Sequence, residues 1–143
     1  MAGIKNDTPT KEIILANEVK FRLSTLRLVR QWKEEFYKGK WSEVNKNDAL
    51  KALIEMLAEN YETTVEIHMD KDIIDSYDSM NKTIHLNSAN PSIVTALHEF
   101  AHHLKGSSEI TACKWSIWLF IKTFPQAYGK LIWDKHMLVR EKL

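Results

Sequence analysis

The chain has little cysteine, glycine or proline, and it lacks a long hydrophobic run. Its one cysteine, Cys113, excludes an intrachain disulfide and a cysteine-rich zinc finger. The longest strongly apolar run, residues 115–124, includes Lys122 and is too short to span a bilayer. The first ten residues lack the apolar segment of a secretory signal peptide. These absences predict a cytoplasmic protein with no membrane segment.

An excess of charge of one sign is also missing. Lysine and arginine total 20 against 19 aspartate and glutamate, so the net charge of +1 does not by itself indicate nucleic acid or a membrane surface. With 143 residues, 44% of them hydrophobic, the chain is long enough for one domain with a buried core. Residues 1–10 are polar and are expected to form a flexible leader, and residues 11–143 a single domain.

The stretch that carries chemistry is residues 98–102, which reads His-Glu-Phe-Ala-His, the H-E-x-x-H arrangement of zinc hydrolases. On a helix, His98 and His102 lie about one turn apart on the same face, so both imidazoles can reach one metal ion. Glu99 flanks that face, where its carboxylate can hydrogen-bond a metal-bound water without being a ligand. His103 lies about 100° away from His102 around the helix and is a poor candidate for the same metal.

The surrounding residues predict a helix with separate chemical and apolar faces. At about 100° per residue, a stripe comprising Ile93, Val94, Leu97, Ala101 and Leu104 falls away from the histidines and is expected to face the core. Asn90 is a plausible N-cap with Pro91 at the first helical position, and Gly106 marks the end of the helix.

A catalytic zinc usually takes three protein ligands, so a third is sought outside the motif. The candidates are Glu109, Asp134, His136, His68 and His85. Glu109 is favoured, because it follows the turn at Gly106 and falls in the first turn of the next helix. The alternative is that Glu109 only interacts with the N-terminus of its own helix, where the dipole favours an acid. For an oxyanion-stabilising residue, spacing does not select among Tyr77, Tyr128 and His136.

The rest of the chain predicts an α+β fold. Residues 11–37 have helical spacing, in one long helix or two, with a basic face of Lys20, Arg22, Arg27, Arg30 and Lys33. This face is either solvated or a docking surface for an acidic partner or nucleic acid. Asn47-Asp48 can cap a second helix, and Trp41 falls in the loop before it.

Period-two alternation predicts strands over residues 64–69 and 83–86 and a shorter one over 73–77, forming a small, mostly antiparallel sheet. The acidic cluster Asp70, Asp72, Asp75 and Asp78 lacks the glycine and final glutamate of an EF-hand, which favours solvated loop carboxylates. A largely buried helix capped by Ser107 or Ser108 should run to about Phe124, and a last helix from Gln126 to Arg140.

These motifs resemble the compact intracellular zincins, and among them the ImmA/IrrE-like metallopeptidases of phages, mobile elements and bacteria. The resemblance spans about residues 64–125 and is carried by segments 82–87 and 96–102, Pro91, and Glu109 followed three residues later by Ala112. It implies a minimal zincin-like fold in which His98, His102 and Glu109 bind zinc and Glu99 is the general base. The linker between His102 and Glu109 is shorter than is typical of that family, and His103 stands where an aliphatic residue is common.

Two other zincin groups share part of the pattern. The metzincins have H-E-x-x-H-x-x-G-x-x-H, but here Gly106 comes one residue late and Ser108 occupies the place of the last ligand. The SprT-like DNA-associated proteases are the other group. The function implied is zinc-dependent hydrolysis of peptide bonds in an intracellular protein, with Glu99 activating a zinc-bound water and strand 83–86 as an edge for the substrate. The alternative is a zinc-binding interaction or regulatory module, of phage or mobile-element type, with little catalysis.

Overall fold

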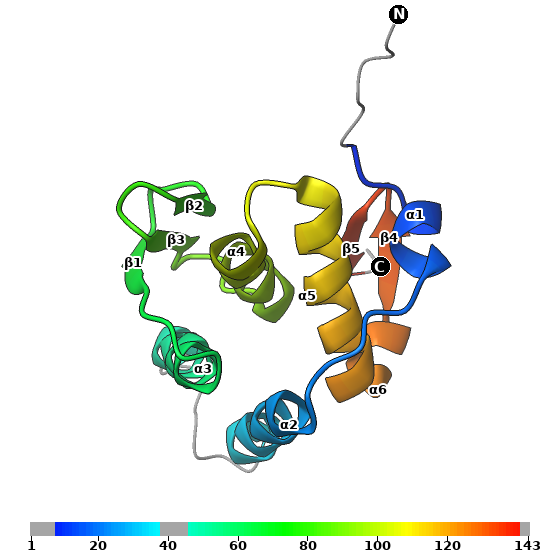
Figure 1. The fold of residues 1–143 in the computed structure, drawn as a ribbon, viewed down its shortest axis with the longest axis horizontal. Helices are drawn as coiled ribbons and strands as arrows, with labels where there is room; N and C mark the ends of the chain where they lie inside the picture. Colours follow the sequence, from blue (N-terminus) through cyan, green and yellow to red (C-terminus); the bar gives the residue numbers. More distant parts are fainter. Residues whose placement is uncertain (1–7, 38–45, 141–143) are drawn as a thin grey trace, which may run out of the picture.

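The computed structural model describes residues 8–37 and 46–140, and it has the expected α+β architecture (Figure 1). In the view of Figure 1, helix α4 (Ile93–Lys105) lies between the three-stranded sheet and helix α5 (Glu109–Thr123). Helices α2 (Leu23–Tyr37) and α3 (Lys46–Asn60) lie below them. The predicted leader falls mostly outside the described residues, and so does Trp41. Among the described residues, no helix has the length and apolar character needed to cross a membrane.

The N-terminal residues form two helices, α1 (Lys11–Ala16) and α2. Thr10 caps α1, because its hydroxyl accepts a hydrogen bond from the backbone N–H of Ile13 at 3.2 Å. Helix α2 packs on α3 through Trp32, whose indole N–H donates to the carbonyl of Ala49 at 2.8 Å inside the core. A buried side chain of this kind contributes about 1.5–3 kcal/mol through its apolar surface.

Two cations of the predicted basic face have a structural role. Arg30 donates to the carbonyl of Lys122 at 3.2 Å, and Lys33 donates to the carbonyl of Thr123 at 3.0 Å. These carbonyls belong to the last turn of α5, where no intrahelical donor remains for them. Part of the basic face therefore stabilises the end of another helix.

The sheet contains β1 (Glu66–Asp70), β2 (Ser76–Asp78) and β3 (Thr83–Asn87) in the order β1-β3-β2. Strand β3 pairs in parallel with β1 and antiparallel with β2. The predicted mostly antiparallel sheet is therefore wrong, and β3 is the central strand and not the expected edge. Alternation identifies the buried face of a strand, here Ile84 and Leu86, but it does not identify the neighbouring strands.

The acidic residues between the strands hold the backbone turns. Asp75 accepts from the backbone N–H of Asn87 at 2.7 Å, and the Asn87 amide donates to the carbonyl of Ile73 at 2.9 Å. Asp70 accepts from the N–H two residues later, and Asp78 accepts from Met80, Asn81 and the Asn81 side chain. In the described part of the chain, these acids are not among the residues grouped closely enough to hold a metal ion.

Helix α4 begins two residues later than the predicted Pro91. Ser92 is the N-cap, with its hydroxyl accepting from the N–H of Thr95 at 3.2 Å, so the expectation of Asn90 as cap is wrong. A serine hydroxyl satisfies a free N–H of the first turn as well as asparagine does. The end of the helix is as predicted: Gly106 has φ 103°, a conformation that residues with a side chain rarely adopt.

Helix α5 is buried on two sides, as its apolar composition predicts. Trp115 and Leu119 belong to the main core that α2, α3, α4 and the sheet share. Cys113 and Ile117 belong to a second cluster with Ile14 of α1. Ser108 caps this helix by accepting from the N–H of Thr111.

The predicted C-terminal helix is wrong beyond Gly129. A short helix α6 (Pro125–Gly129) is followed by an antiparallel hairpin of β4 (Leu131–Asp134) and β5 (Met137–Arg140). Lys135 has φ 60° and forms the tight turn with the next residue. Along β4, half-buried Leu131 and Trp133 alternate with exposed residues, which is the period of a strand. Over so short a segment, the apolar positions also fit helical spacing, so the sequence pattern does not distinguish the two.

Candidate metal centre

Two consecutive helices bring three potential metal ligands together. His98 and His102 project from successive turns of α4, and Glu109 is the first residue of α5. Nε2 of His102 lies 2.6 Å from Oε1 of Glu109, and Nε2 of His98 lies 3.4 Å from Oε2. One ligand atom from each residue lies within 4.8 Å of the others, and this is the group that could hold a metal ion among the described residues.

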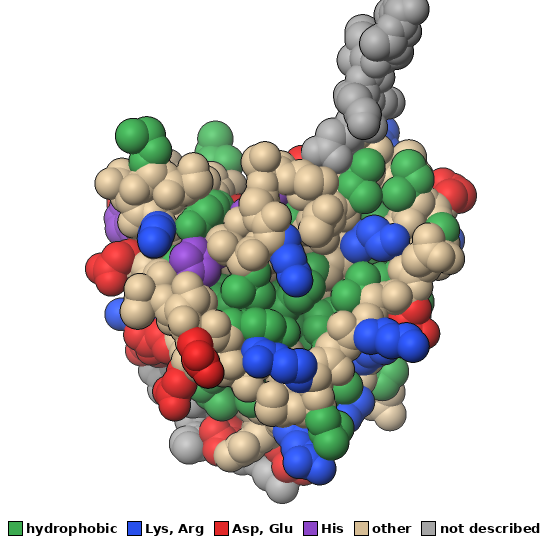
Figure 2. Space-filling model, viewed as in Figure 1, with side chains coloured by type: hydrophobic (Ala, Val, Ile, Leu, Met, Phe, Trp, Pro, Cys, Tyr) green, Lys and Arg blue, Asp and Glu red, His purple; other side chains and the backbone are tan. Residues whose placement is uncertain are grey.

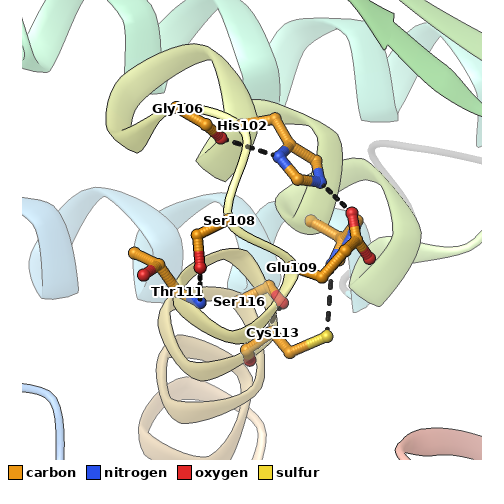
Figure 3. A network of polar contacts seen from close by, with 8 residues as sticks. His102, Gly106, Ser108, Glu109, Thr111, Cys113 and Ser116 are labelled. Carbon is orange, nitrogen blue, oxygen red and sulfur yellow. Dashed lines mark hydrogen bonds and ion pairs between the residues drawn. The ribbon is translucent and has the colours of Figure 1, made fainter. Parts of the chain in front are cut away.

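The orientation of His102 is fixed by the end of its own helix (Figure 3). Its Nδ1 lies 2.8 Å from the carbonyl oxygen of Gly106. A carbonyl has no proton to give, so Nδ1 must carry the hydrogen and donate it. In the neutral ring Nε2 is then the acceptor, and it is aimed at the carboxylate of Glu109. This is the arrangement in which a backbone carbonyl orients a histidine ligand for a metal.

His98 is held on its other side by α5. Its Nδ1 lies 3.8 Å from the sulfur of Cys113, and its ring meets that of His102 edge to face with centroids 4.8 Å apart. Burial lowers the pKa of His98, against the opposing effect of Glu109, so its imidazole is neutral at pH 7. The neutral imidazole is the form that binds a metal.

The donor set fits a zinc ion. Nε2 of His102 and Oε1 of Glu109 lie 2.6 Å apart, a hydrogen-bond distance with one proton between the two atoms, and zinc would take the place of that proton. Zinc with bonds of about 2.0–2.2 Å in tetrahedral geometry separates its ligand atoms by about 3.3 Å, close to the 3.4 Å between His98 and Glu109. The Glu109 side chain is 48% exposed, which leaves one side of the cluster open to solvent.

Glu99 lies beside the cluster as a buried carboxyl group, only 7% exposed. No hydrogen bond or ion pair joins its side chain to another residue in the described ranges, although buried carboxyl groups usually have a partner. The pKa of Glu99 is raised to about 7, mainly by burial; His102 lowers it, and Glu109 and Asp75 add to the rise. A carboxyl group with such a pKa and no partner is typical of functional sites.

Two cavities meet at these residues and form one cleft. The first, of about 460 Å³, is polar and lies between the cluster and strand β2, where Ser76 and Tyr77 line it. The second, of about 250 Å³, is more apolar and lies against the C-terminal hairpin, with Ile117 and Leu138 in its wall. Both are lined by Asp75, His98, Glu99 and Glu109. The cluster therefore lies between two compartments of different polarity.

The other ligand candidates lie apart from the cluster. His68 and His85 contact each other across β1 and β3, with their Nδ1 atoms 3.1 Å apart. His103 is hydrogen-bonded with Tyr77 at 2.6 Å and with Thr63 at 2.9 Å. Its ring therefore connects α4 to strand β2 and to the segment before β1. Asp134 is in the hairpin and outside the cluster.

The three oxyanion candidates are separated by their positions. Tyr77 lines the first cavity and His136 the second. Tyr128 lines neither, and its hydroxyl accepts from the indole N–H of Trp133 at 3.2 Å. Desolvation, with a smaller effect of Asp78, raises the pKa of Tyr77, so its phenol keeps its proton at pH 7.

Sequence reasoning missed two features of the site. The sequence favours a solvated loop carboxylate at Asp75, but Asp75 lines both cavities. Cys113 is buried in the second core cluster, and its sulfur also contacts His98. The helical spacing that places Cys113 on the face of Glu109 was the available signal.

Comparison of the chain with protein-family models, curated proteins and solved structures found no match. The assignment therefore depends on this chain's own residues. They place a His-His-Glu cluster, which could hold a metal ion, on helices α4 and α5 of an α+β fold.

Proposed function

We propose that this protein is a zinc-dependent metallopeptidase similar to the ImmA/IrrE-like enzymes. The observation that carries the proposal is the convergence of His98, His102 and Glu109 within 4.8 Å, beside the buried carboxyl of Glu99. Three protein ligands with an open side are the arrangement of catalytic zinc sites, whereas structural sites are closed by four.

His98, His102 and Glu109 would hold the zinc ion. When bound, zinc supplies Lewis-acid chemistry: it lowers the pKa of a coordinated water towards 7 and polarises a carbonyl group. The carbonyl of Gly106 would keep the His102 ring in the orientation that a ligand needs.

Glu99 would be the general base. It lies one residue after His98 and lines both cavities, so its carboxylate can reach a water molecule placed between the ligands and the substrate. It would take a proton from that water as the carbonyl carbon is attacked, and give the proton to the leaving nitrogen when the peptide bond breaks. A base works best when its pKa lies near the working pH, and burial gives Glu99 a pKa of about 7.

The substrate would lie along strand β2. Among the described strands it is at the edge of the sheet, paired with β3, and Ser76 and Tyr77 of this strand line the polar cavity next to the cluster. An extended peptide can add to such an edge through main-chain hydrogen bonds. A residue on the other side of the scissile bond would then enter the apolar cavity next to the hairpin.

The test uses the zinc-loaded protein and a pool of synthetic peptides whose products are read by mass spectrometry. We expect cleavage by the wild type and by Glu55→Gln, an exposed glutamate on α3. We expect loss of at least about a hundredfold in Glu99→Gln, the range contributed by a general base, with zinc content unchanged.

Two results would refute the proposal. If Glu99→Gln cleaves as fast as the wild type, Glu99 is not the base. If wild type and Glu99→Gln both bind zinc and neither cleaves any peptide of the pool, the protein is a zinc-binding interaction module, the alternative that the sequence left open.

A further inference from the structure

A second site lies on the molecular face shown in Figure 2, near the connection between α4 and α5 and separate from the two cavities at the metal centre. It is a groove of about 610 Å³ between the segment before α2, the end of α3, and helices α4 and α5. Its apolar wall consists of Val19, Phe21, Tyr61 and Trp115. Figure 2 shows apolar side chains in the middle of this face with lysine and arginine side chains around them. We call this site the basic groove.

The charge of the basic groove is of one sign. Lys20, Arg22, Lys105 and Lys114 line it, and none of the other described residues that line it carries a carboxylate. In the described ranges, neither Lys105 nor Lys114 forms an ion pair. Glu18, whose pKa is lowered by Lys122 and also by Lys20, is already paired with Lys122 and lies outside the lining. Four cations around an apolar floor, in a chain of net charge +1, are a local concentration of positive charge.

Arg22 is fixed in place by its neighbours. Its guanidinium lies 4.1 Å from the centre of the Tyr61 ring and donates to the backbone carbonyl of Asn60 at 3.0 Å. Lys20 and Lys105 are exposed. The groove therefore presents one fixed guanidinium beside lysine ammonium groups on flexible four-carbon stems, which suits carboxylates at several spacings.

The aromatic rings of the groove are not open for base stacking. Trp115 is only 4% exposed, and the edges of Phe21 and Tyr61 pack against it with centroids 5.6 and 6.2 Å away. One face of Tyr61 is covered by Arg22. Single-stranded nucleic acids bind aromatic side chains whose faces are free, so this floor suits an aliphatic or aromatic side chain placed in a hollow instead.

We infer that the basic groove binds an acidic segment of a partner protein, in which an apolar residue is flanked by aspartate or glutamate. The apolar residue would enter the hollow over Trp115, and the flanking carboxylates would meet Lys105 and Lys114. Charge complementarity of this kind determines the choice of partner and the rate of association. The groove shares no lining residue with the two cavities at the metal centre, so the inference does not depend on the proposed function.

The test measures binding of fluorescent peptide pools to the full chain. One pool has leucine or phenylalanine between acidic residues, a second has serine in place of the apolar residue, and a third has lysine in place of the acids. A single-stranded oligonucleotide is the fourth probe. We expect binding of the first pool only, weakening as salt is raised because the Debye length shortens.

The variant Lys105→Glu/Lys114→Glu should weaken binding of the first pool by at least about tenfold, because two attractions become repulsions. Lys51→Glu, an exposed lysine on α3 outside the groove, is the matched control and should bind as the wild type does. His98→Ala should also bind as the wild type does, which separates this site from the metal centre. Thermal melting checks that each variant is folded.

Equal binding of the first pool by wild type and the double variant would overturn the inference, and so would failure of the first pool to bind. Equal binding of the second pool would show that no apolar anchor enters the groove. Tighter binding of the oligonucleotide than of any peptide would assign the surface to nucleic acid instead.

Discussion

Replacing Glu99 with glutamine should stabilise the metal-free protein at high pH while it removes the proposed base. The wild-type carboxyl is only 7% exposed, and burial raises its pKa from 4.5 to about 7. In the unfolded chain Glu99 loses its proton near pH 4.5, but in the folded chain it keeps the proton up to about pH 7. Between these values the folded state binds the extra proton, so raising the pH lowers the free energy of unfolding.

The size of the effect follows from the two pKa values. Each pKa unit corresponds to about 1.4 kcal/mol, so by pH 8 the ionised carboxylate costs the folded state about 3 kcal/mol relative to pH 4. Glutamine has nearly the same shape and does not ionise. The stability of Glu99→Gln minus that of the wild type should therefore grow by about 3 kcal/mol over this range.

The assay is urea denaturation followed by tryptophan fluorescence, at a series of pH values with EDTA present. Titrating groups distant from Glu99 are common to the two proteins, so their contributions cancel in the difference. Glu55→Gln, at an exposed position, should show no pH-dependent difference. If the curves for wild type and Glu99→Gln run parallel from pH 4 to pH 8, Glu99 is not the buried, destabilised carboxyl described above.

Three further substitutions test other parts of the structure by urea denaturation. Gly106→Ala should lower the free energy of unfolding by about 1–3 kcal/mol, because φ is 103° at this position. It should also weaken zinc binding in a titration, because the Gly106 carbonyl orients His102. Unchanged stability would contradict the strained turn. Lys135→Gly should stabilise the protein by up to about 1 kcal/mol, because φ of Lys135 is 60° in the hairpin turn and glycine adopts this conformation more easily. If residues 126–140 formed the helix that the sequence predicts, the same substitution would destabilise the protein. Leu57→Ala should cost about 2–5 kcal/mol, because Leu57 is fully buried in the main core; a cost below 1 kcal/mol would place it elsewhere.

The helices of the site could be predicted from sequence because local signals agree there. Three local signals determine the backbone here. The spacing of His98 and His102 indicates a helix, the glycine after them ends it, and the serine before Glu109 begins the next helix. The apolar stripe of α4 then determines which face is buried. Glu109 could be favoured as the third residue because a short turn leaves the chain few directions in which to continue.

Sheet topology and the C-terminal hairpin could not be predicted in the same way. The neighbours of β3 depend on contacts distant in sequence, such as Asp75 with the backbone of Asn87. In the hairpin, the turn depends on a left-handed lysine, a conformation that glycine or asparagine signals in sequence and Lys135 does not. The burial of Glu99 likewise follows from how α4 packs between the sheet and α5, and not from its position in the motif.

Metal analysis of the purified protein tests the central claim most directly. We predict about one zinc ion per chain, lost in His98→Ala, His102→Ala and Glu109→Ala, and kept in His68→Ala, which changes an exposed histidine of β1 outside the cluster. Zinc retained in all three cluster variants, or lost equally in His68→Ala, would show that His98, His102 and Glu109 do not form the metal site.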